Sequence, residues 1–286
     1  KFLVISKELL ESSFKKLDQE LRVDLNGKQL NKDITSNLLL NRNSNLKCVI
    51  SNREKIILCG ITFIENFLEK RFPEITVKSL FDEGTELKKN SKIFYISGNA
   101  KIILAIERTI LNFLIHLSSI STLTNKFIRK MSSQKTKLLN TRKTTTGLRK
   151  FEKYATQVGG AINHRMGLYD KILIKDNHIE VLGGIDNTLQ RLSNKHINDC
   201  QIECENYFQV KKCIKMGIKY ILLDNMSPSE VKRCIGLKIK NKTEFEITGG
   251  ISIKNIHKYS NLGADYISTG KITNSANSVD IGLDII

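Results

Sequence analysis

Residues 138–179 read LLNTRKTTTGLRKFEKYATQVGGAINHRMGLYDKILIKDNHI. Two short apolar runs in this stretch, LLN and KILI, have the length and composition of buried strands, and the residues between them up to Val158 are predicted to form a helix. A strand, a helix and a second strand of this kind form one unit of a parallel sheet.

Basic side chains lie in this stretch where the chain changes course. Arg142 and Lys143 follow the first apolar run, and Lys175 follows the second. His164 and Arg165 lie in a loop after a glycine pair. Cations at the ends of elements, rather than along an exposed helix face, favour a pocket for a ligand with several negative charges.

The alternation continues to the end of the chain. The predicted strands are, in order, LLN, KILI, QIEC, YILL, EFEI and DYIS, with helices predicted between them at about 185–192, 207–216, from 227 and at 253–262. Six such units in succession favour a closed or nearly closed α/β barrel. No G-x-G-x-x-G motif opens the first unit, which is evidence against a dinucleotide-binding domain.

The first third of the chain has no fixed repeat. A helix is predicted from Phe2 to about Phe14 and another over 61–72, before Pro73, with strands at 75–80 and 92–97. This pattern predicts an N-terminal α+β domain over 1–108, and a long helix from about Ala100 to Lys130 leads into a barrel domain over 109–275. Taken alone, Arg108 is a solvated residue of that helix.

Composition limits the class of protein. The 286 residues are 40% hydrophobic with two prolines, and 46 basic against 29 acidic residues give a net charge of +17. An anionic partner is indicated: phosphate-bearing small molecules, nucleic acid or a membrane surface. The lysines are scattered, no nucleic-acid recognition motif appears, and no apolar run approaches a membrane span, so neither nucleic acid nor a membrane is the expected partner.

The six cysteines form no C-x-x-C pair. Cys200 and Cys204 lie on a predicted strand, which separates their sulfurs by roughly 13 Å at ~3.3 Å per residue, too far for one tetrahedral metal. Reduced, buried thiols in a cytoplasmic protein are therefore expected, and no signal peptide opens the chain.

Successive strand ends carry a distinct series of side chains. After the two basic ends come an acidic residue on QIEC, Glu203, and another after YILL, Asp224; glycine-rich ends follow, at Thr248-Gly249-Gly250 and at Thr269-Gly270. In a barrel the carboxyl ends of the strands meet at one rim, and the last loops often hold a phosphate on backbone N–H groups. The cations suit the carboxylates or phosphates of a ligand. The carboxylates suit a sugar, a developing positive charge or Mg²⁺. Together these side chains point towards phosphoryl or phosphoribosyl chemistry.

The motifs on these strand ends resemble those of the quinolinate phosphoribosyltransferase family. They are TRKTTTGLR, GGAINHRMGLYDKILIKDNH, ILLDNMSPSEV, EITGGISIKNI and GADYISTGKITNSANSVDIGLDI, with DITSNLL, ERTILNFL and HLSSISTLT in the earlier part. The resemblance implies an N-terminal α+β domain, to which residues 276–286 return, an incomplete TIM-like α/β barrel, and a homodimer or a multiple of one. It implies transfer of phosphoribosyl from 5-phosphoribosyl 1-pyrophosphate to quinolinate with Mg²⁺, giving nicotinate mononucleotide, pyrophosphate and CO₂ in NAD biosynthesis.

Site residues follow from the motifs. An anionic pocket is implied for Thr141, Arg142, Lys143, His164, Arg165 and Lys175, ribose and metal contacts for Glu203 and Asp224, and 5′-phosphate contacts for Thr248, Gly249, Gly250 and Gly270. Lys143, Lys175, Glu203 and Asp224 are the catalytic candidates, and either lysine could assist decarboxylation. Mg²⁺ is expected on the substrate's pyrophosphate, with Glu203 and Asp224 as candidates for direct contact. Arg108 is implied to reach the partner subunit's site.

Some positions depart from the family pattern. The family usually has Glu-x-Glu on the strand of Glu203, and here Gln201 stands at the other glutamate. Thr146 and Asn99 replace prolines, Thr248 replaces a serine, and Lys271 and Asn274 replace a small residue and a histidine. Two alternatives stay open: a related phosphoribosyltransferase that uses nicotinate or another heterocyclic acid, and a basic nucleic-acid-binding protein.

Overall fold

The computed structural model describes residues 5–27, 29–133 and 135–286, so the first residues of the helix predicted from Phe2 lie outside the described part. The chain divides into two compact units. Unit 1 comprises residues 1–125, 148–159 and 276–286, and unit 2 comprises residues 126–147 and 160–275. Each is described by itself below.

Unit 1 is an α+β unit built on a four-stranded sheet of order β12-β1-β5-β3, in which all neighbouring strands are antiparallel. Its strands are β1 (Asn45–Asn52), β2 (Ile56–Ile57), β3 (Thr76–Ser79), β4 (Glu86–Leu87), β5 (Lys92–Asn99) and β12 (Ile281–Ile285). Its helices are α1 (Lys7–Asp24), η1 (Leu30–Lys32), α2 (Ile34–Leu39), α3 (Ile61–Arg71), α4 (Ala100–Lys130), of which the last five residues fall in unit 2, and α5 (Arg149–Val158).

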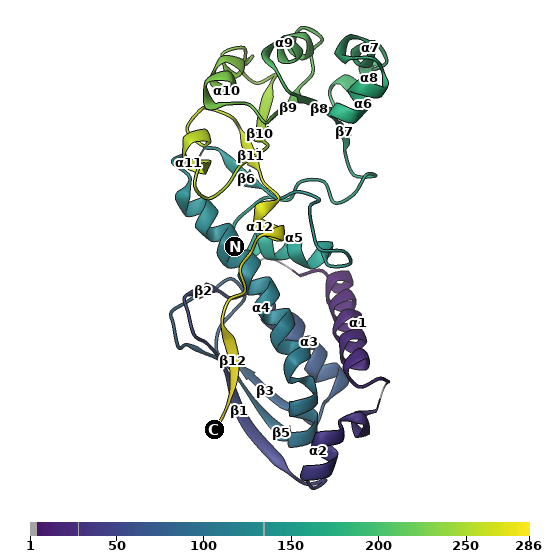
Figure 1. The fold of residues 1–286 in the computed structure, drawn as a ribbon, viewed down its shortest axis with the longest axis vertical. Coiled ribbons are helices and arrows are strands. Elements are labelled where there is room, and N and C mark those ends of the chain that lie inside the picture. Colours follow the sequence, from purple (N-terminus) through teal and green to yellow (C-terminus); the bar gives the residue numbers. More distant parts are fainter. Residues whose placement is uncertain (1–4, 28, 134) are drawn as a thin grey trace. The chain divides into compact units, whose positions relative to one another are not determined.

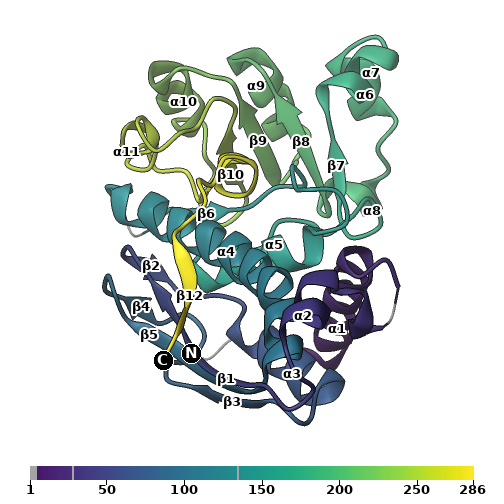
Figure 2. The ribbon, with the colours of Figure 1, turned by 60° about the horizontal axis from the view of Figure 1, so that its bottom comes forward.

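The core of unit 1 lies between this sheet and α3 and α4 (Figure 2). Phe63 of α3 contacts the rings of Phe113, Phe151 and Tyr154, with centroid separations of 5.1 to 6.0 Å. α4 is apolar and long enough to cross a membrane by length and composition, in contrast to the sequence-based expectation that no such segment exists. However, 61% of its most apolar window is buried, as in the core helix of a globular unit.

Unit 2 contains a six-stranded parallel sheet of order β6-β11-β10-β9-β8-β7 with helices on its outer side (Figure 1). Its strands are β6 (Lys137–Leu139), β7 (Ile172–Ile174), β8 (Cys200–Cys204), β9 (Tyr220–Asp224), β10 (Glu244–Thr248) and β11 (Tyr266–Ser268). Its helices are α6 (Asp176–Val181), α7 (Ile185–Gln190), α8 (Asn194–Ile197), α9 (Tyr207–Lys215), α10 (Pro228–Ile235), α11 (Ile256–Tyr259) and α12 (Lys271–Asn274).

The sheet of unit 2 is an incomplete barrel, as the family resemblance implied. Among the described strands, β6 and β7 are its two edges and do not pair with each other. On the open side of β6, Leu139 forms a single bridge with Ile162. All six predicted strands are present and in the predicted order.

The division into units differs from the sequence-based domain boundary at 108. Residues 109–125 of α4 belong to unit 1 because Ile110, Leu111 and Leu114 are buried in its core. α5, predicted to be a barrel helix, also belongs to unit 1, since Phe151 and Tyr154 pack in the same core. Residues 276–286 belong to unit 1 as well, where β12 pairs with β1.

Candidate active site

One cavity of about 660 Å³ lies at the carboxyl ends of the strands of unit 2. Every site residue implied by the motifs lines it, except Arg108: Thr141, Arg142, Lys143, His164, Arg165, Lys175, Glu203, Asp224, Thr248, Gly249, Gly250 and Gly270. They come together because parallel strands end at one rim, and each of these residues lies at or just after a strand end, apart from the loop pair His164-Arg165. Arg108 is exposed on α4, in unit 1.

Two arginines are among the cations that line the cavity. Arg165 is 5% exposed and donates through one terminal nitrogen to the carbonyl oxygen of Lys171 at 3.1 Å. Burial lowers the pKa of Arg165, and the nearby charge of Arg142 lowers it further. Within the described residues, the Nε atoms of Arg142 and Arg165 are buried without a hydrogen-bond partner. Buried donors of this kind are costly unless they are satisfied, and two like charges side by side are stabilised by an anion between them.

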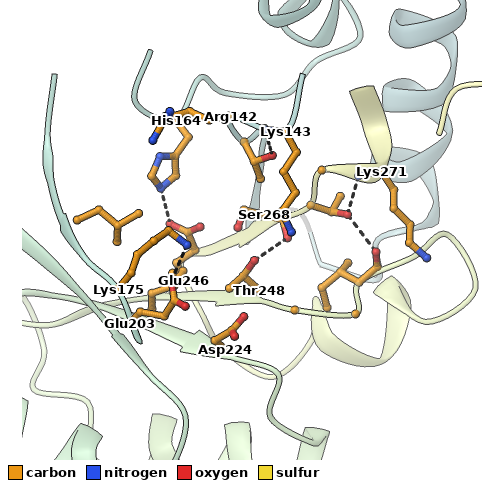
Figure 3. Close-up of a pocket in the computed structure, with 18 of the residues that line it drawn as sticks. Arg142, Lys143, His164, Lys175, Glu203, Asp224, Glu246, Thr248, Ser268 and Lys271 are labelled. Atoms are coloured by element: carbon orange, nitrogen blue, oxygen red, sulfur yellow. Dashed lines mark hydrogen bonds and ion pairs between the residues drawn. The ribbon is translucent and has the colours of Figure 1, made fainter. Parts of the chain in front are cut away.

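Lys175 follows β7 and is oriented by its own short helix. Its backbone N–H donates to Nδ1 of His178 at 2.9 Å, which closes the first turn of α6. Its Nζ forms an ion pair with a carboxylate oxygen of Glu203 at 3.0 Å (Figure 3). A cation and an anion are therefore held together at the end of neighbouring strands.

Two carboxylates face the cavity from β8 and β9. Glu203 is 5% exposed and Asp224 is half-buried at the last position of its strand. Burial raises the pKa of Glu203, an effect that Lys175 opposes and that the charges of Asp224 and Asp176 reinforce. Burial likewise raises the pKa of Asp224, where Lys175 and Lys143 act in the opposite direction and Asp176 in the same one. Partly desolvated carboxylates interact strongly with a positive charge that forms beside them.

The glycine-rich ends of β10 and β11 let the backbone approach the other side of the cavity. Gly249 has a φ of +81°, and a Cβ there would lie 2.5 Å from the backbone nitrogen of Asn225. At Gly270 a Cβ would lie 2.9 Å from the side chain of Lys143. Thr273 donates through its hydroxyl to the carbonyl oxygen of Lys143 at 2.6 Å, so the backbone at Lys143 is held against the start of α12.

Sequence reasoning assigned no role to several residues that line the same cavity. Asp176 follows Lys175 directly, and Glu246 lies in the middle of β10. Ser268 and Ser275 also line it, as do Lys271 and Asn274, which depart from the family pattern. The alternation in EFEI was the available signal for Glu246, because it places two carboxylates on one face of the strand.

The six cysteines take no part in the cavity. All are buried, and none forms a disulfide bond in the described chain. The sulfurs of Cys204 and Cys213 lie 3.7 Å apart. Over residues 5–27, 29–133 and 135–286, no group of three or more His, Cys, Asp or Glu side chains could hold a metal ion by itself.

Comparison with known proteins agrees with this geometry. The family profile for the quinolinate phosphoribosyl transferase N-terminal domain matches residues 33–118, and that for its C-terminal domain matches residues 120–284. A probable nicotinate-nucleotide pyrophosphorylase (carboxylating) of Methanocaldococcus jannaschii is 37% identical over 264 residues, which cover 89% of this chain and 92% of that protein. A protein of the same name from Bacillus subtilis is 34% identical, with 88% of each chain covered.

Solved structures lead to the same family. The crystal structure of nicotinate-nucleotide pyrophosphorylase from Ehrlichia chaffeensis superposes with a TM-score of 0.89 at 36% identity, covering 99% of this chain and 100% of that one. On the two domain profiles, the curated relatives and this structure, the chain belongs to the quinolinate phosphoribosyltransferase family.

Proposed function

We propose that this chain is a nicotinate-nucleotide diphosphorylase (carboxylating), a pentosyltransferase of NAD biosynthesis. It joins quinolinate to 5-phosphoribosyl 1-pyrophosphate and releases nicotinate mononucleotide, pyrophosphate and CO₂. The observation that carries this proposal is the pair of arginines, Arg142 and Arg165, whose buried Nε atoms have no partner in the described chain. A planar guanidinium binds a carboxylate through two parallel hydrogen bonds, so two of them suit a substrate with two carboxylates.

The remaining side chains suit the phosphoribosyl donor. Backbone N–H groups at Gly249, Gly250 and Gly270, with the hydroxyl of Thr248, are suited to a 5′-phosphate, since they line the same cavity on its glycine-rich side. The backbone carbonyl of Lys143 accepts from the hydroxyl of Thr273, and its side chain lies beside Gly270, which supports a role for its cation at the phosphate groups. Lys271, which lines the cavity as well, adds a further cation there.

Transfer begins when the pyridine nitrogen of quinolinate attacks C1 of the ribose as the bond to pyrophosphate breaks. Positive charge develops on the ribose, and Glu203 and Asp224 face it with partly desolvated carboxylates. Lys175 holds Glu203 in place through their 3.0 Å ion pair. Glu203 and Arg165 are themselves almost wholly buried, so both charged groups have little contact with solvent.

Decarboxylation follows from the charge on the ring. Once the ring nitrogen carries the ribose it is cationic, so the bond from C2 to its carboxylate breaks with the electron pair left on the ring, and a proton then adds at C2. We assign that proton to Lys175, since its Nζ is ion-paired with Glu203, whereas the side chain of Lys143 lies beside Gly270 on the glycine-rich side of the cavity. Lys175→Met is therefore expected to slow CO₂ release more than it weakens phosphoribosyl pyrophosphate binding.

The donor set fits Mg²⁺ only as a partner of the substrate. Mg²⁺ is usually held by one or two carboxylates together with phosphate oxygens, and Glu203 and Asp224 are the carboxylates that would hold it. When bound, the ion supplies charge neutralisation for the departing pyrophosphate.

We also infer a homodimer in which Arg108 completes the partner's site. Arg108 is exposed on α4, and in the same unit three of the six residues of α2 are apolar and strongly exposed: Ile34, Leu38 and Leu39, at 82%, 81% and 72%. Contiguous exposed apolar side chains favour a protein interface. A cytoplasmic location is inferred from the six buried, unbonded cysteines.

The test is a substrate comparison with purified protein, phosphoribosyl pyrophosphate and Mg²⁺. Quinolinate is expected to give nicotinate mononucleotide and CO₂, and nicotinate to give little product. Arg142→Ala and Arg165→Ala are expected to raise the KM for quinolinate by about 10- to 100-fold. Efficient use of nicotinate without release of CO₂ would instead make the chain a related phosphoribosyltransferase that uses nicotinate.

A further inference from the structure

Glu246 lies at the boundary between two cavities of unit 2. The second cavity, of about 770 Å³, is lined by residues at the amino ends of the strands, among them Tyr220, Glu244 and Tyr266. Only three described residues line both cavities: His164, Leu173 and Glu246. Glu246 is 3% exposed, so its carboxylate must be satisfied by its neighbours.

Two side chains contact one oxygen of this carboxylate. Gln201, on β8, donates through its amide nitrogen to Oε2 of Glu246 at 2.8 Å. Nε2 of His164 lies 3.3 Å from the same oxygen, and Figure 3 shows the two side chains pointing toward each other. Gln201 stands where the family usually has a glutamate. A glutamate there would face Glu246 with a second carboxylate, whereas the amide donates to it.

The other nitrogen of the His164 ring is also engaged. Nδ1 accepts a hydrogen bond from the backbone N–H of Arg165 at 2.8 Å, so in the neutral ring the proton lies on Nε2, which faces Glu246. The backbone N–H of His164 donates to Oδ1 of Asn140 at 3.1 Å, and Asn140 is fully buried. The loop at 164–165 is therefore held by side chains rather than by a regular element.

We infer that Glu246 is a positioning residue that holds His164 in its Nε2–H tautomer and, through the ring's Nδ1, places the backbone of Arg165 for dicarboxylate binding. The inference rests on the proposed function for the substrate that Arg165 binds. Gln201 supports it by donating to the same carboxylate. Loss of Glu246 removes the acceptor that it supplies to Nε2–H of His164, which loosens the ring and weakens its hydrogen bond to Arg165.

The tautomer can be measured without any substrate. In protein labelled with ¹⁵N at histidine, the ring nitrogens of His164, assigned by loss of its signals in His164→Asn, are expected to report a protonated Nε2 and a bare Nδ1. Glu246→Gln should keep this pattern because an amide oxygen still accepts the hydrogen bond. Glu246→Leu should give a mixture of tautomers. An unchanged pattern in Glu246→Leu would overturn the inference whatever the substrate proves to be.

Kinetics then test the link to Arg165. Glu246→Leu is expected to raise the KM for quinolinate about tenfold and that for phosphoribosyl pyrophosphate less than about threefold, with Glu246→Gln close to the parent protein. A matched control is Glu152→Leu in unit 1, since buried Glu152 also contacts a histidine, Nε2 of His116, at 2.9 Å. Glu152→Leu is expected to lower the melting temperature without changing the KM for quinolinate more than the KM for phosphoribosyl pyrophosphate.

The outcomes separate the inference from the function. If the parent protein does not use quinolinate, the proposed function fails and the tautomer measurement still decides on Glu246. If it does, and Glu246→Leu changes both KM values alike, then Glu246 has only a structural role. If Glu246→Leu does not fold, Gln201→Leu is the second variant, because it removes one of the two contacts to the Glu246 carboxylate. It is expected to raise the KM for quinolinate more than the KM for phosphoribosyl pyrophosphate, by a smaller factor than Glu246→Leu. If Gln201→Leu produced no such selective change, the inference would equally be contradicted.

Discussion

At the scale of single residues, the ionisation of Glu203 and Asp224 is expected to determine the lowest pH at which the protein is active. Burial raises the pKa of both carboxyl groups, and the negative charge of Asp176 raises both further. In the proposed mechanism each must be ionised to stabilise a cationic ribose, so activity is expected to fall as the pH drops through these raised pKa values. The acidic limb of the pH profile therefore lies at a higher pH than for ordinary carboxyl groups.

Asp176→Asn removes one negative charge from beside both groups. Their pKa values should fall, and the acidic limb of kcat/KM against pH should move to lower pH. Asp186→Asn serves as control, because Asp186 forms an exposed ion pair with Lys212. A limb that stays in place, or moves to higher pH, would mean that Asp176 does not act on these carboxyl groups as described.

Gly249 shows how closely the backbone approaches the site. Gly249→Ala introduces a Cβ 2.5 Å from the backbone nitrogen of Asn225 at a φ of +81°, so the loop must shift. The KM for phosphoribosyl pyrophosphate is expected to rise by at least about tenfold. Gly263→Ala carries similar backbone strain, at a φ of +98°, but meets only an ordinary contact at 3.5 Å. Its KM should match that of the parent protein; equal effects in both variants would point to strain alone.

At the scale of elements, α5 packs in the core of unit 1, although the chain on either side of it belongs to unit 2. Phe151 is buried there, with ring centroids 5.9 Å from Phe63 and 5.4 Å from Phe113. Phe151→Ala leaves a cavity in a packed aromatic cluster and is expected to lower the free energy of unfolding by about 3–5 kcal/mol. Phe208→Ala, at a ring that is 69% exposed, should change it by less than about 1 kcal/mol. Denaturant unfolding compares the two, and similar losses would contradict the burial of α5.

The sequence predicted the barrel strands well because each is a short apolar run with a polar end. Very short helices escaped prediction: α6 has six residues and α12 four, so neither contains enough turns for a helical repeat to be recognised. The helix expected over 253–262 is α11, with only four residues. The role of Glu246 was missed because a strand pattern gives the face of a side chain and not its partners, which come from β8 and from the loop of His164.

At the scale of the whole molecule, a boundary between the units could not be read from the sequence. α4 is one continuous helix of 31 residues. Its apolar stripe predicts that one face is buried, but it does not predict which residues belong to which unit. The same holds for Arg108, whose position on α4 looks like that of any solvated helix residue. Its proposed role depends on a second chain, which a single sequence pattern does not contain.

Arg108 is tested by mixing two inactive proteins. Arg108→Ala removes the group proposed to enter the partner's site, and Lys175→Ala removes the lysine from its own site. Each variant alone is expected to have less than about 1% of the parent activity. After unfolding and refolding together, mixed dimers contain one intact site, so about a quarter of the parent activity should return. No recovery, with dimers present by light scattering, would contradict the shared site.

The most direct test of the central claim follows the fate of one carbon. Quinolinate labelled with ¹³C in its 2-carboxylate is incubated with the protein, phosphoribosyl pyrophosphate and Mg²⁺. The account predicts one labelled CO₂ for each unlabelled nicotinate mononucleotide and each pyrophosphate formed. Label that remains in the nucleotide product, or product formed from nicotinate in preference to quinolinate, would contradict it.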